Sequence, residues 1–407
     1  MQANALSRRG AWALTLAATF TMTISYVDRQ TLSFLAPTVT RELKFSDSEY
    51  GLLASAFSLA YLLGSPVAGR WIDRVGARRG LVAAVLVWTA VAALHAVVPG
   101  YRALLGCRIL LGVAESPSFP GAAQTVQRAL PPAERARGFG ILFTGSSLGA
   151  MIAPWLATLL LARFPWRFAF VGTALAGLVW LPVWLLVTSP PAARDALDAA
   201  PDPRAETPLS AISLATHPAV LRAAAVVVAS SPVIGFVLLW SSKFLDREYG
   251  IGQKELGQYV WLPPLLFDIG AVAFGDLAAR RARDGDRLLV AVAAALTALV
   301  ALIPLAPREG GAWGAMAIAS LALAGGGGLF ALATADILAP VPAGSVSAAG
   351  GVTAAAQSLA YIASSLLIGW SVDRTHSYRA SLLALGGWVL PGCLVWLFVP
   401  PPRRAAR

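Results

Sequence analysis

Gly69–Arg79 reads Gly-Arg-Trp-Ile-Asp-Arg-Val-Gly-Ala-Arg-Arg and lies between two long apolar stretches. A partial copy, Gly-Asp-Leu-Ala-Ala-Arg-Arg-Ala-Arg, begins 206 residues later at Gly275, again directly after an apolar stretch. A second echo, Trp-Arg at 166–167 and Tyr-Arg at 378–379, is 212 residues apart. An offset of about half the chain indicates two related halves arranged as a parallel repeat.

The composition shows that these halves lie in a membrane. Of the 407 residues, 57% are hydrophobic and 13% are charged, whereas soluble domains carry about 25% charged residues. A spanning helix needs roughly 20 mostly apolar residues, and about twelve such stretches are present. We therefore expect an all-α membrane protein with twelve transmembrane helices in two pseudo-symmetric six-helix bundles, and no enzyme, because little chain remains for a soluble catalytic domain. The expected spans are 11–39, 50–70, 80–98, 102–124, 138–161, 166–188, 219–244, 256–279, 286–305, 312–337, 347–370 and 379–400.

The domain organisation follows from one polar segment. Ser189–Pro218 is the only long polar run in the chain and is rich in Pro, Ala, Asp and Arg, which is typical of a flexible linker. It divides the chain into an N-terminal bundle (1–188), a cytoplasmic linker (189–218) and a C-terminal bundle (219–407).

The net charge of +11 reflects membrane topology, and we expect no nucleic-acid partner. With both termini and the linker in the cytoplasm, 18 of the 32 Lys and Arg residues face the cytoplasm, 11 face the other side and three lie within spans. Cytoplasmic loops carry this kind of excess, so we expect a multi-pass protein of a bacterial inner membrane with both termini cytoplasmic. Neither the cysteines, Cys107 and Cys393, nor the scattered histidines suggest a metal site or disulfide, and no P-loop is present, so no cofactor is expected.

Two adjacent charges interrupt the first span, in Tyr26-Val-Asp28-Arg29. A charged residue at mid-bilayer costs roughly 2.5–3.5 kcal/mol on insertion scales, so both need polar surroundings. Adjacent residues point about 100° apart around a helix and cannot share one direction. They are candidates for a functional site; alternatively they neutralise partners on neighbouring helices, or the span ends early.

The fourth span carries a second charged pair, Arg108 and Glu115. Seven residues make two turns, so both side chains project from nearly one face, roughly 10 Å apart along the axis. This face lines either a cavity or a polar network within the helix. Burial should favour the neutral form of Glu115, whereas the nearby Arg108 should favour the charged form. These opposed effects suit a proton carrier.

Gly69–Arg79, hereafter the signature loop, resembles the major facilitator signature G-x-x-x-D-R-x-G-x-R-R. The resemblance implies a transporter whose two halves rock against each other. It also implies that the loop takes part in gating; the residues concerned are Gly69, Asp73, Arg74, Gly76 and Arg78. The plainer interpretation is a basic cytoplasmic loop that turns at Gly76.

The charged spans resemble those of the anion:cation symporter family. The matching residues are Tyr26-x-Asp28-Arg29, Arg108-x3-Gly112-x2-Glu115-x-Pro117-x-Phe119-Pro120 and Pro131-x2-Glu134-Arg135. Bacterial members take up sugar acids, such as hexuronates and aldonates, with protons. The resemblance implies that Arg29 and Arg108 act on the substrate carboxylate, that Asp28 and Glu115 are the proton-coupling pair, and that Tyr61 is a cavity tyrosine.

The second half resembles the hexuronate branch around Trp240-Ser-Ser-Lys243, which implies that Lys243 faces the outer mouth of the cavity. Its alternative is a lysine that snorkels to the membrane surface. Family members often place an amide near Ser146 and asparagines on the eleventh helix. This chain has Ser146 and Gln357 instead, and these two are the candidates for contacts with the substrate's hydroxyl groups, with Gln357 supplying one amide.

These observations together predict a secondary active transporter that imports an organic anion by proton symport through alternating access. We expect a sugar acid as substrate, a monomer, and no partner beyond anion, protons and lipid bilayer. Two alternatives stay open: an exporter of a small metabolite or drug, and a non-transporting membrane sensor with the same fold. The fifth helix lacks the Gly-Pro pair that is usual in exporters, and no signalling domain is evident in the sequence.

Overall fold

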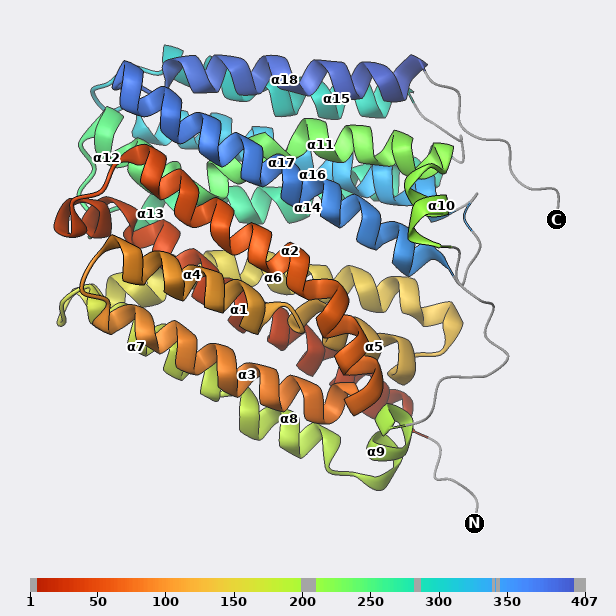
Figure 1. Cartoon of the computed structure of the whole chain (residues 1–407). Coiled ribbons are helices and arrows are strands. Elements are labelled where there is room, and N and C mark those ends of the chain that lie inside the picture. The colour runs from red at the N-terminus through yellow and green to blue at the C-terminus, as the bar shows by residue number, and fades with distance from the viewer. Residues whose placement is uncertain (1–5, 199–209, 282–286, 339–340, 342–344, 399–407) are drawn as a thin grey trace. The chain divides into compact units, whose positions relative to one another are not determined.

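The computed structural model describes residues 6–198, 210–281, 287–338, 341 and 345–398. Within these ranges every regular element is a helix (Figure 1), so the prediction of an all-α fold is confirmed. Eleven of the helical segments are long and apolar enough to cross a membrane. The twelfth span consists of α4 (Tyr101–Glu115) and α5 (Ser118–Ala129), which a break at Ser116 and Pro117 separates.

The chain forms two compact units, and each is described by itself. Unit 1 comprises Met1–Phe45, Ala56–Pro201 and Gly252–Trp261. Unit 2 comprises Ser46–Ser55, Asp202–Ile251 and Leu262–Arg407. Each unit therefore contains a short segment from the other half of the sequence.

In unit 1 the long helix α1 is central and packs against α5, α6, α7 and α8. It approaches α6 closely because small residues line the contact: a Cβ atom added at Gly149 would lie 2.3 Å from the carbonyl oxygen of Thr23. Membrane helices commonly pack through such small residues. The helices of unit 1 are α1 (Arg8–Leu43), α2 (Asp47–Val75) from Ala56 onward, α3 (Ala77–Leu94), η1 (His95–Val97), α4, α5, α6 (Pro132–Leu161), α7 (Arg167–Leu178), α8 (Trp180–Thr188), α9 (Pro191–Asp198) and α13 (Gly257–Val260).

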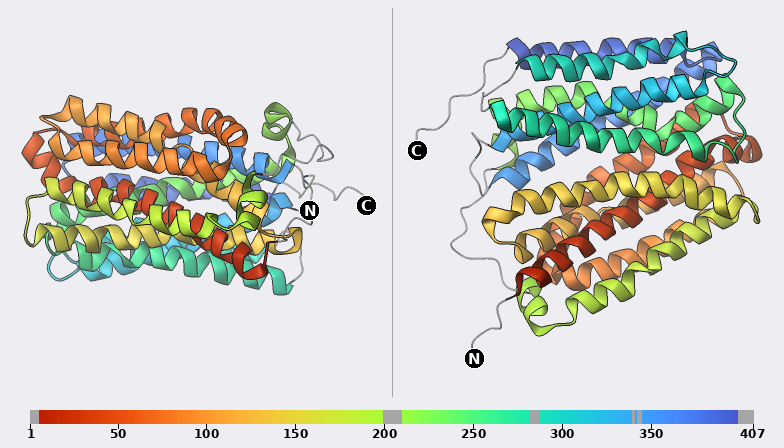
Figure 2. Two further views of the ribbon diagram at one scale, coloured as in Figure 1. Left: turned by 90° about the horizontal axis from the view of Figure 1, so that it is seen from below. Right: turned by 180° about the vertical axis from the view of Figure 1, so that it is seen from behind.

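In unit 2 the central helix is α11, which packs against α16, α17 and α18. The four consecutive glycines 325–328 lie where α16 contacts its neighbours, and a Cβ added at Gly327 would lie 2.1 Å from the carbonyl oxygen of Phe267 on α14. The glycine run therefore permits close helix packing. The helices are the start of α2, α10 (Ala211–Ala215), α11 (Pro218–Leu239), α12 (Ser241–Tyr249), α14 (Leu262–Arg281), α15 (Arg287–Ala298), η2 (Leu299–Leu305), α16 (Ala312–Leu338), α17 (Val346–Thr375) and α18 (Arg379–Phe398). Figure 2 shows that the long helices of this unit, coloured green to blue, run roughly parallel to one another.

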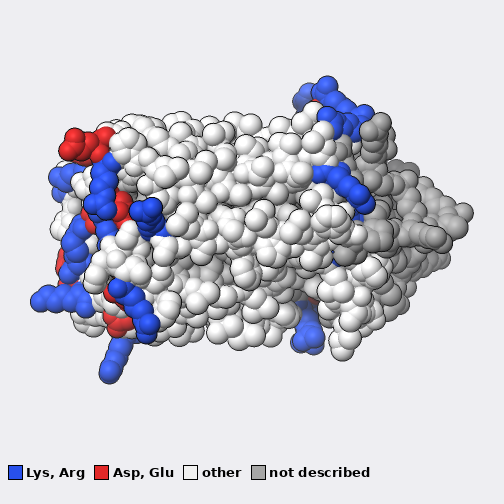
Figure 3. All heavy atoms as spheres, turned by 90° about the horizontal axis from the view of Figure 1, so that it is seen from above, with Lys and Arg blue, Asp and Glu red and all other residues white. Residues whose placement is uncertain are grey.

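The surface of unit 2 that α15 and α18 form is uncharged along its middle. Figure 3 shows charged side chains gathered at both ends of this face and a broad band without them between. Such a band fits the hydrocarbon core of a bilayer, about 30 Å thick. Of the expected linker Ser189–Pro218, residues 199–209 lie outside the described ranges, and the remainder contains α9 and α10.

Candidate functional site

A buried ion pair joins α1 and α4 inside unit 1. Arg29 Nε lies 2.6 Å from Glu115 Oε2, and the Glu115 side chain is 0% exposed. Ser25 donates a hydrogen bond from Oγ to the same carboxylate oxygen, at 2.9 Å. Residues four apart on a helix lie on one face, so α1 presents Ser25 and Arg29 together to α4. Arg29 and Glu115, both predicted as site residues, are thus brought together.

Three aromatic rings surround the guanidinium group of Arg29. Its Cζ atom lies 4.4 Å from the ring centroid of Tyr61, 4.8 Å from that of Tyr26 and 5.1 Å from that of Phe57. The face of an aromatic ring attracts a cation through its quadrupole. The rings therefore stabilise a positive charge within an apolar bundle. Tyr61, the predicted cavity tyrosine, has the shortest of the three distances.

Arg108 is a second buried cation of unit 1. Its Cζ atom lies 4.5 Å from the ring centroid of Phe57, which also contacts Arg29. Phe57 therefore lies against both arginines that the sequence assigned to the substrate carboxylate. Glu115, two helical turns after Arg108, forms its ion pair with Arg29 of the other helix.

Asp28 is buried in a different way from Glu115. Within the described part of the chain, neither of its carboxylate oxygens has a hydrogen-bond partner, whereas Glu115 Oε2 has two. An ionised carboxylate that is buried without hydrogen bonds is costly. The two predicted proton-coupling residues thus have unlike surroundings in the same unit.

The signature loop makes a one-residue turn between α2 and α3. Gly76 has φ 83° and ψ 147°, a backbone conformation that residues other than glycine rarely adopt. Gln124 of α5 donates a hydrogen bond to Asp73 Oδ1 at 3.0 Å and accepts one from the backbone N–H of Ala77 at 2.9 Å. Asp73 therefore connects the loop to α5 through a glutamine.

Of the other residues of the signature loop, Arg78 contacts α9 and Arg74 faces outward. Arg78 Nη2 lies 2.7 Å from Asp198 Oδ2 of α9, and Arg78 Nε donates to the same oxygen at 3.1 Å. Arg74 is exposed, and a Cβ at Gly69 would meet nothing within 4 Å. The structure thus attaches the loop to α5 and α9 within unit 1.

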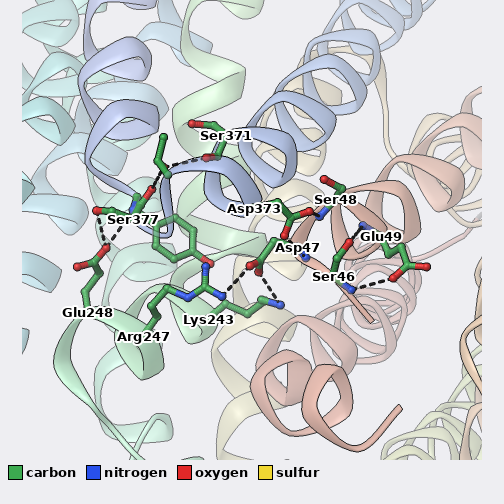
Figure 4. A network of polar contacts seen from close by, with 12 residues as sticks. Ser46, Asp47, Ser48, Glu49, Lys243, Arg247, Glu248, Ser371, Asp373 and Ser377 are labelled. Carbon is green, nitrogen blue, oxygen red and sulfur yellow. Dashed lines mark hydrogen bonds and ion pairs between the residues drawn. The ribbon is translucent and has the colours of Figure 1, made fainter. Parts of the chain in front are cut away.

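Lys243 lies in unit 2, where it belongs to an ionic cluster. Its Nζ atom lies 2.8 Å from Asp47 Oδ1, and Arg247 Nη2 lies 2.7 Å from Asp47 Oδ2. Figure 4 shows both cations pointing toward Asp47, with Asp373 on its other side. Burial alone would lower the pKa of the Arg247 guanidinium, but the charge and hydrogen bond of Asp47, together with Tyr378 and Asp373, outweigh burial, and that pKa is raised above its usual value.

The two residues expected near sugar hydroxyls lie in separate units. Ser146 is half-buried on α6 of unit 1, beside the contact between α6 and α1. Gln357 is on α17 of unit 2, and its amide nitrogen donates to the Tyr361 hydroxyl at 3.2 Å.

Three polar or aromatic contributors were missed by the sequence reasoning: Ser25, Phe57 and Asp47. The motif Ser46-x-x-Glu49 is a capping box, which marks a helix start and could have drawn attention to Asp47 as the first helical residue. Among the described residues, no group of three or more His, Cys, Asp and Glu side chains is arranged to hold a metal ion.

Comparisons with known proteins show transporters that this chain is similar to. The hexuronate transporter of Bacillus subtilis (strain 168) is 31% identical over 257 residues, which are 62% of this chain and 60% of that protein. The hexuronate transporter of Escherichia coli (strain K12) is 27% identical over 280 residues, which are 65% of this chain and 64% of that protein. The aligned part therefore spans less than two thirds of the length of either relative.

A crystal structure of a bacterial homologue of the human lysosomal transporter Spinster has a similar fold. It matches with a TM-score of 0.76 and 16% sequence identity, covering 96% of this chain and 97% of that one. The model of the Major Facilitator Superfamily matches residues 18–365, which include the signature loop and the ion pair. This match confirms the resemblance to the major facilitator signature: the chain belongs to the Major Facilitator Superfamily.

Proposed function

We propose that this transporter imports an organic anion, a sugar acid such as a hexuronate or an aldonate, together with protons by alternating access. The observation that carries the proposal is the ion pair between Arg29 and the fully buried Glu115. The names of the relatives, hexuronate transporters in both bacteria, support a sugar acid as the substrate class.

The ion pair suggests how anion and proton are coupled. A substrate carboxylate can form a charge-assisted pair with Arg29 only if it displaces Glu115. Protonation of Glu115 removes the competing charge and frees the guanidinium. The aromatic rings of Tyr26, Phe57 and Tyr61 keep the cation in place while its anionic partner changes. Proton uptake therefore favours substrate binding.

Arg108 and Asp28 complete the proposed site. Arg108 shares the Phe57 ring with Arg29, so it supplies a second cation beside the same substrate carboxylate. Asp28 is buried without hydrogen bonds to its carboxylate among the described residues, which suits a group that carries a proton during part of the cycle. Ser146 and Gln357 are the candidates for contacts with hydroxyl groups, and Lys243 is the further candidate cation.

The proposal includes the orientation of the chain. The two hexuronate transporters come from bacteria, which supports an inner membrane, and the distribution of Lys and Arg supports cytoplasmic termini and linker. We expect the signature loop to act in gating from the cytoplasmic side, and the protein to work as a monomer.

Transport by reconstituted protein tests the function. Proteoliposomes with an imposed inward pH gradient should accumulate labelled D-glucuronate, D-galacturonate or D-galactonate, and a thermal-shift screen should identify the sugar acids that stabilise the protein by mass action. Accumulation driven by sodium and not by protons would overturn the coupling. Efflux without uptake would indicate an exporter, and ligand binding without transport would indicate a sensor.

A further inference from the structure

Helix α2 belongs to both units. Its first residues, within Ser46–Ser55, are part of unit 2, and the helix continues in unit 1 from Ala56. The segment Gly252–Trp261 shows the reverse exchange, because it is part of unit 1 while the residues on both sides belong to unit 2. The two segments are 206 residues apart, the offset between Gly69 and Gly275. The same place in each half of the repeat is therefore exchanged.

The two exchanged segments are held by different chemistry. In unit 1, Gln253 donates from Nε2 to the carbonyl oxygen of Phe34 at 2.8 Å, and its Oε1 accepts from the Thr38 hydroxyl at 2.9 Å. The equivalent residue in the repeat is Asp47, whose carboxylate lies between Lys243 and Arg247 of α12. One segment is thus held by neutral hydrogen bonds and the other by ion pairs.

The backbone at the start of α2 is also bound by a charge. The two carboxylate oxygens of Asp373 accept the backbone N–H groups of Asp47 at 2.9 Å and Ser48 at 2.8 Å (Figure 4). These N–H groups are at the positive end of the helix, where a carboxylate is favourable. The negative charge of Asp47 therefore attaches this turn to α12, and the negative charge of Asp373 attaches it to α17.

The first turn of α2 does not depend on Asp373 to remain helical. The backbone N–H of Ser46 donates to Glu49 Oε2 at 2.8 Å, and the N–H of Glu49 donates to Ser46 Oγ at 3.1 Å, which is a capping box. This cap moves with the helix. The turn can therefore leave α12 and α17 as a folded unit, and water can solvate the separated charges, since the Arg247 side chain is already 36% exposed.

We propose that Asp47 is a positioning residue of the transport cycle: its ion pairs with Lys243 and Arg247 hold the first turn of α2 on unit 2, and they break whenever that turn is released. Helix α2 continues into unit 1. The ion pairs of Asp47 therefore determine when the first turn of α2 can move together with the rest of the helix. Lys243, the further candidate cation of the proposed site, acts in this attachment as long as the turn is held on unit 2.

A cysteine placed on the exchanged segment tests the release. Ser55 is 4% exposed and donates to the carbonyl oxygen of Ile362 in unit 2. In the purified full-length protein, with Cys107→Ser and Cys393→Ser, a Ser55→Cys thiol should react slowly with a fluorescent maleimide. Adding Asp47→Asn should raise the labelling rate at least about tenfold, because it breaks a buried ion pair. The assay needs no substrate, so its outcome is independent of the proposed function.

Two controls separate release from general loosening. Glu49→Gln removes one negative charge from the same turn but keeps the capping box, which accepts Gln, and should leave the rate within about twofold. Native Cys393, 2% exposed in α18 of unit 2, reports on the stability of the unit in a Cys107→Ser protein and should stay unreactive with Asp47→Asn. Equal acceleration at both thiols, or none at Ser55→Cys, overturns the proposal.

A milder variant covers the case in which Asp47→Asn does not fold. Arg247→Gln removes one of the two pairs from a partly exposed side chain and should still raise labelling at Ser55→Cys by a factor of about three, consistent with the smaller contribution of exposed pairs. An unchanged rate in this variant would show that the ion pairs are not what holds the turn.

Discussion

Arg29 of α1 pairs with Glu115 of α4 across the interior of unit 1, at 2.6 Å. Each of these residues has an oppositely charged neighbour on its own helix: Asp28 adjoins Arg29, and Arg108 precedes Glu115 by two turns. The pair across the helices means that the arginine proposed to bind the substrate carboxylate already holds a carboxylate of the protein. Substrate and proton therefore act on one ion pair.

Replacing Arg29 with alanine should abolish substrate binding and lower stability. The variant leaves Glu115 buried without its cation, and breaking a buried pair in this way costs about 3–5 kcal/mol. The melting temperature of the purified protein and the Kd for D-glucuronate measure the two effects. In the double variant Arg29→Ala/Glu115→Gln the stability should recover, because neither charge remains, while binding stays lost. Recovery of binding in the double variant would show that the carboxylate is held elsewhere.

Replacing Arg108 with lysine should also fail to support binding. A lysine keeps the charge but not the planar fork that binds a carboxylate through two hydrogen bonds. Losing one of the two hydrogen bonds to a charged carboxylate costs about 1.5–3 kcal/mol, so Kd should rise at least about tenfold. Isothermal titration with D-glucuronate measures it. Near-normal affinity in both Arg108→Lys and Arg108→Ala would remove Arg108 from the site.

Two glycines of the signature loop should respond in opposite ways to alanine. Gly76 has φ 83° and ψ 147°, so Gly76→Ala should destabilise the protein by about 1–3 kcal/mol. Gly69 lies within α2, and an added Cβ would meet nothing within 4 Å, so Gly69→Ala should be neutral or stabilising by up to about 1 kcal/mol. Denaturation of both variants in the same detergent checks the contrast, and equal effects would contradict it.

Reporter fusions should place the linker in the cytoplasm. The excess of Lys and Arg on the side of the linker and termini motivates the expectation. A green fluorescent protein fused after Ala199 should fluoresce, and alkaline phosphatase at the same position should be inactive. Active phosphatase together with a dark fluorescent fusion would show that the orientation is reversed.

Much of the fold could be predicted because it depends on composition and periodic apolar stretches. The twelve spans and the two-fold repeat of Gly69 and Gly275 follow from features that each segment carries within itself. The assignment of Ser46–Ser55 to unit 2 could not be predicted, because it depends on contacts with α12 and α17 that only the folded chain makes.

The candidate site was predictable in its residue types and not in its pairings. A charge within an apolar span is visible in the sequence because its burial is costly, and this drew attention to Asp28, Arg29, Arg108 and Glu115. Which carboxylate faces which arginine depends on the rotation and crossing of α1 and α4. Phe57 was missed for another reason: an aromatic residue in an apolar span carries no signal until a cation is found beside it.

Glu115→Gln should uncouple transport from the proton gradient. Glutamine resembles protonated glutamate in shape and carries no charge, so it leaves Arg29 free for the substrate at every pH. The variant should therefore exchange substrate across the membrane at near-normal rates but fail to accumulate it when a pH gradient is imposed. Paired uptake and counterflow of labelled D-glucuronate in proteoliposomes measure the two activities.

Asp28→Asn should distinguish the role of Asp28 from that of Glu115. Asp28 has no hydrogen-bond partner at its carboxylate within the described residues, so its neutral amide should impair coupling without releasing a partner as Glu115→Gln releases Arg29. Counterflow should consequently become independent of pH in Glu115→Gln and keep its pH dependence in Asp28→Asn. If Glu115→Gln still concentrates substrate in response to the gradient, then Glu115 serves only to neutralise Arg29, and the proton must be carried elsewhere.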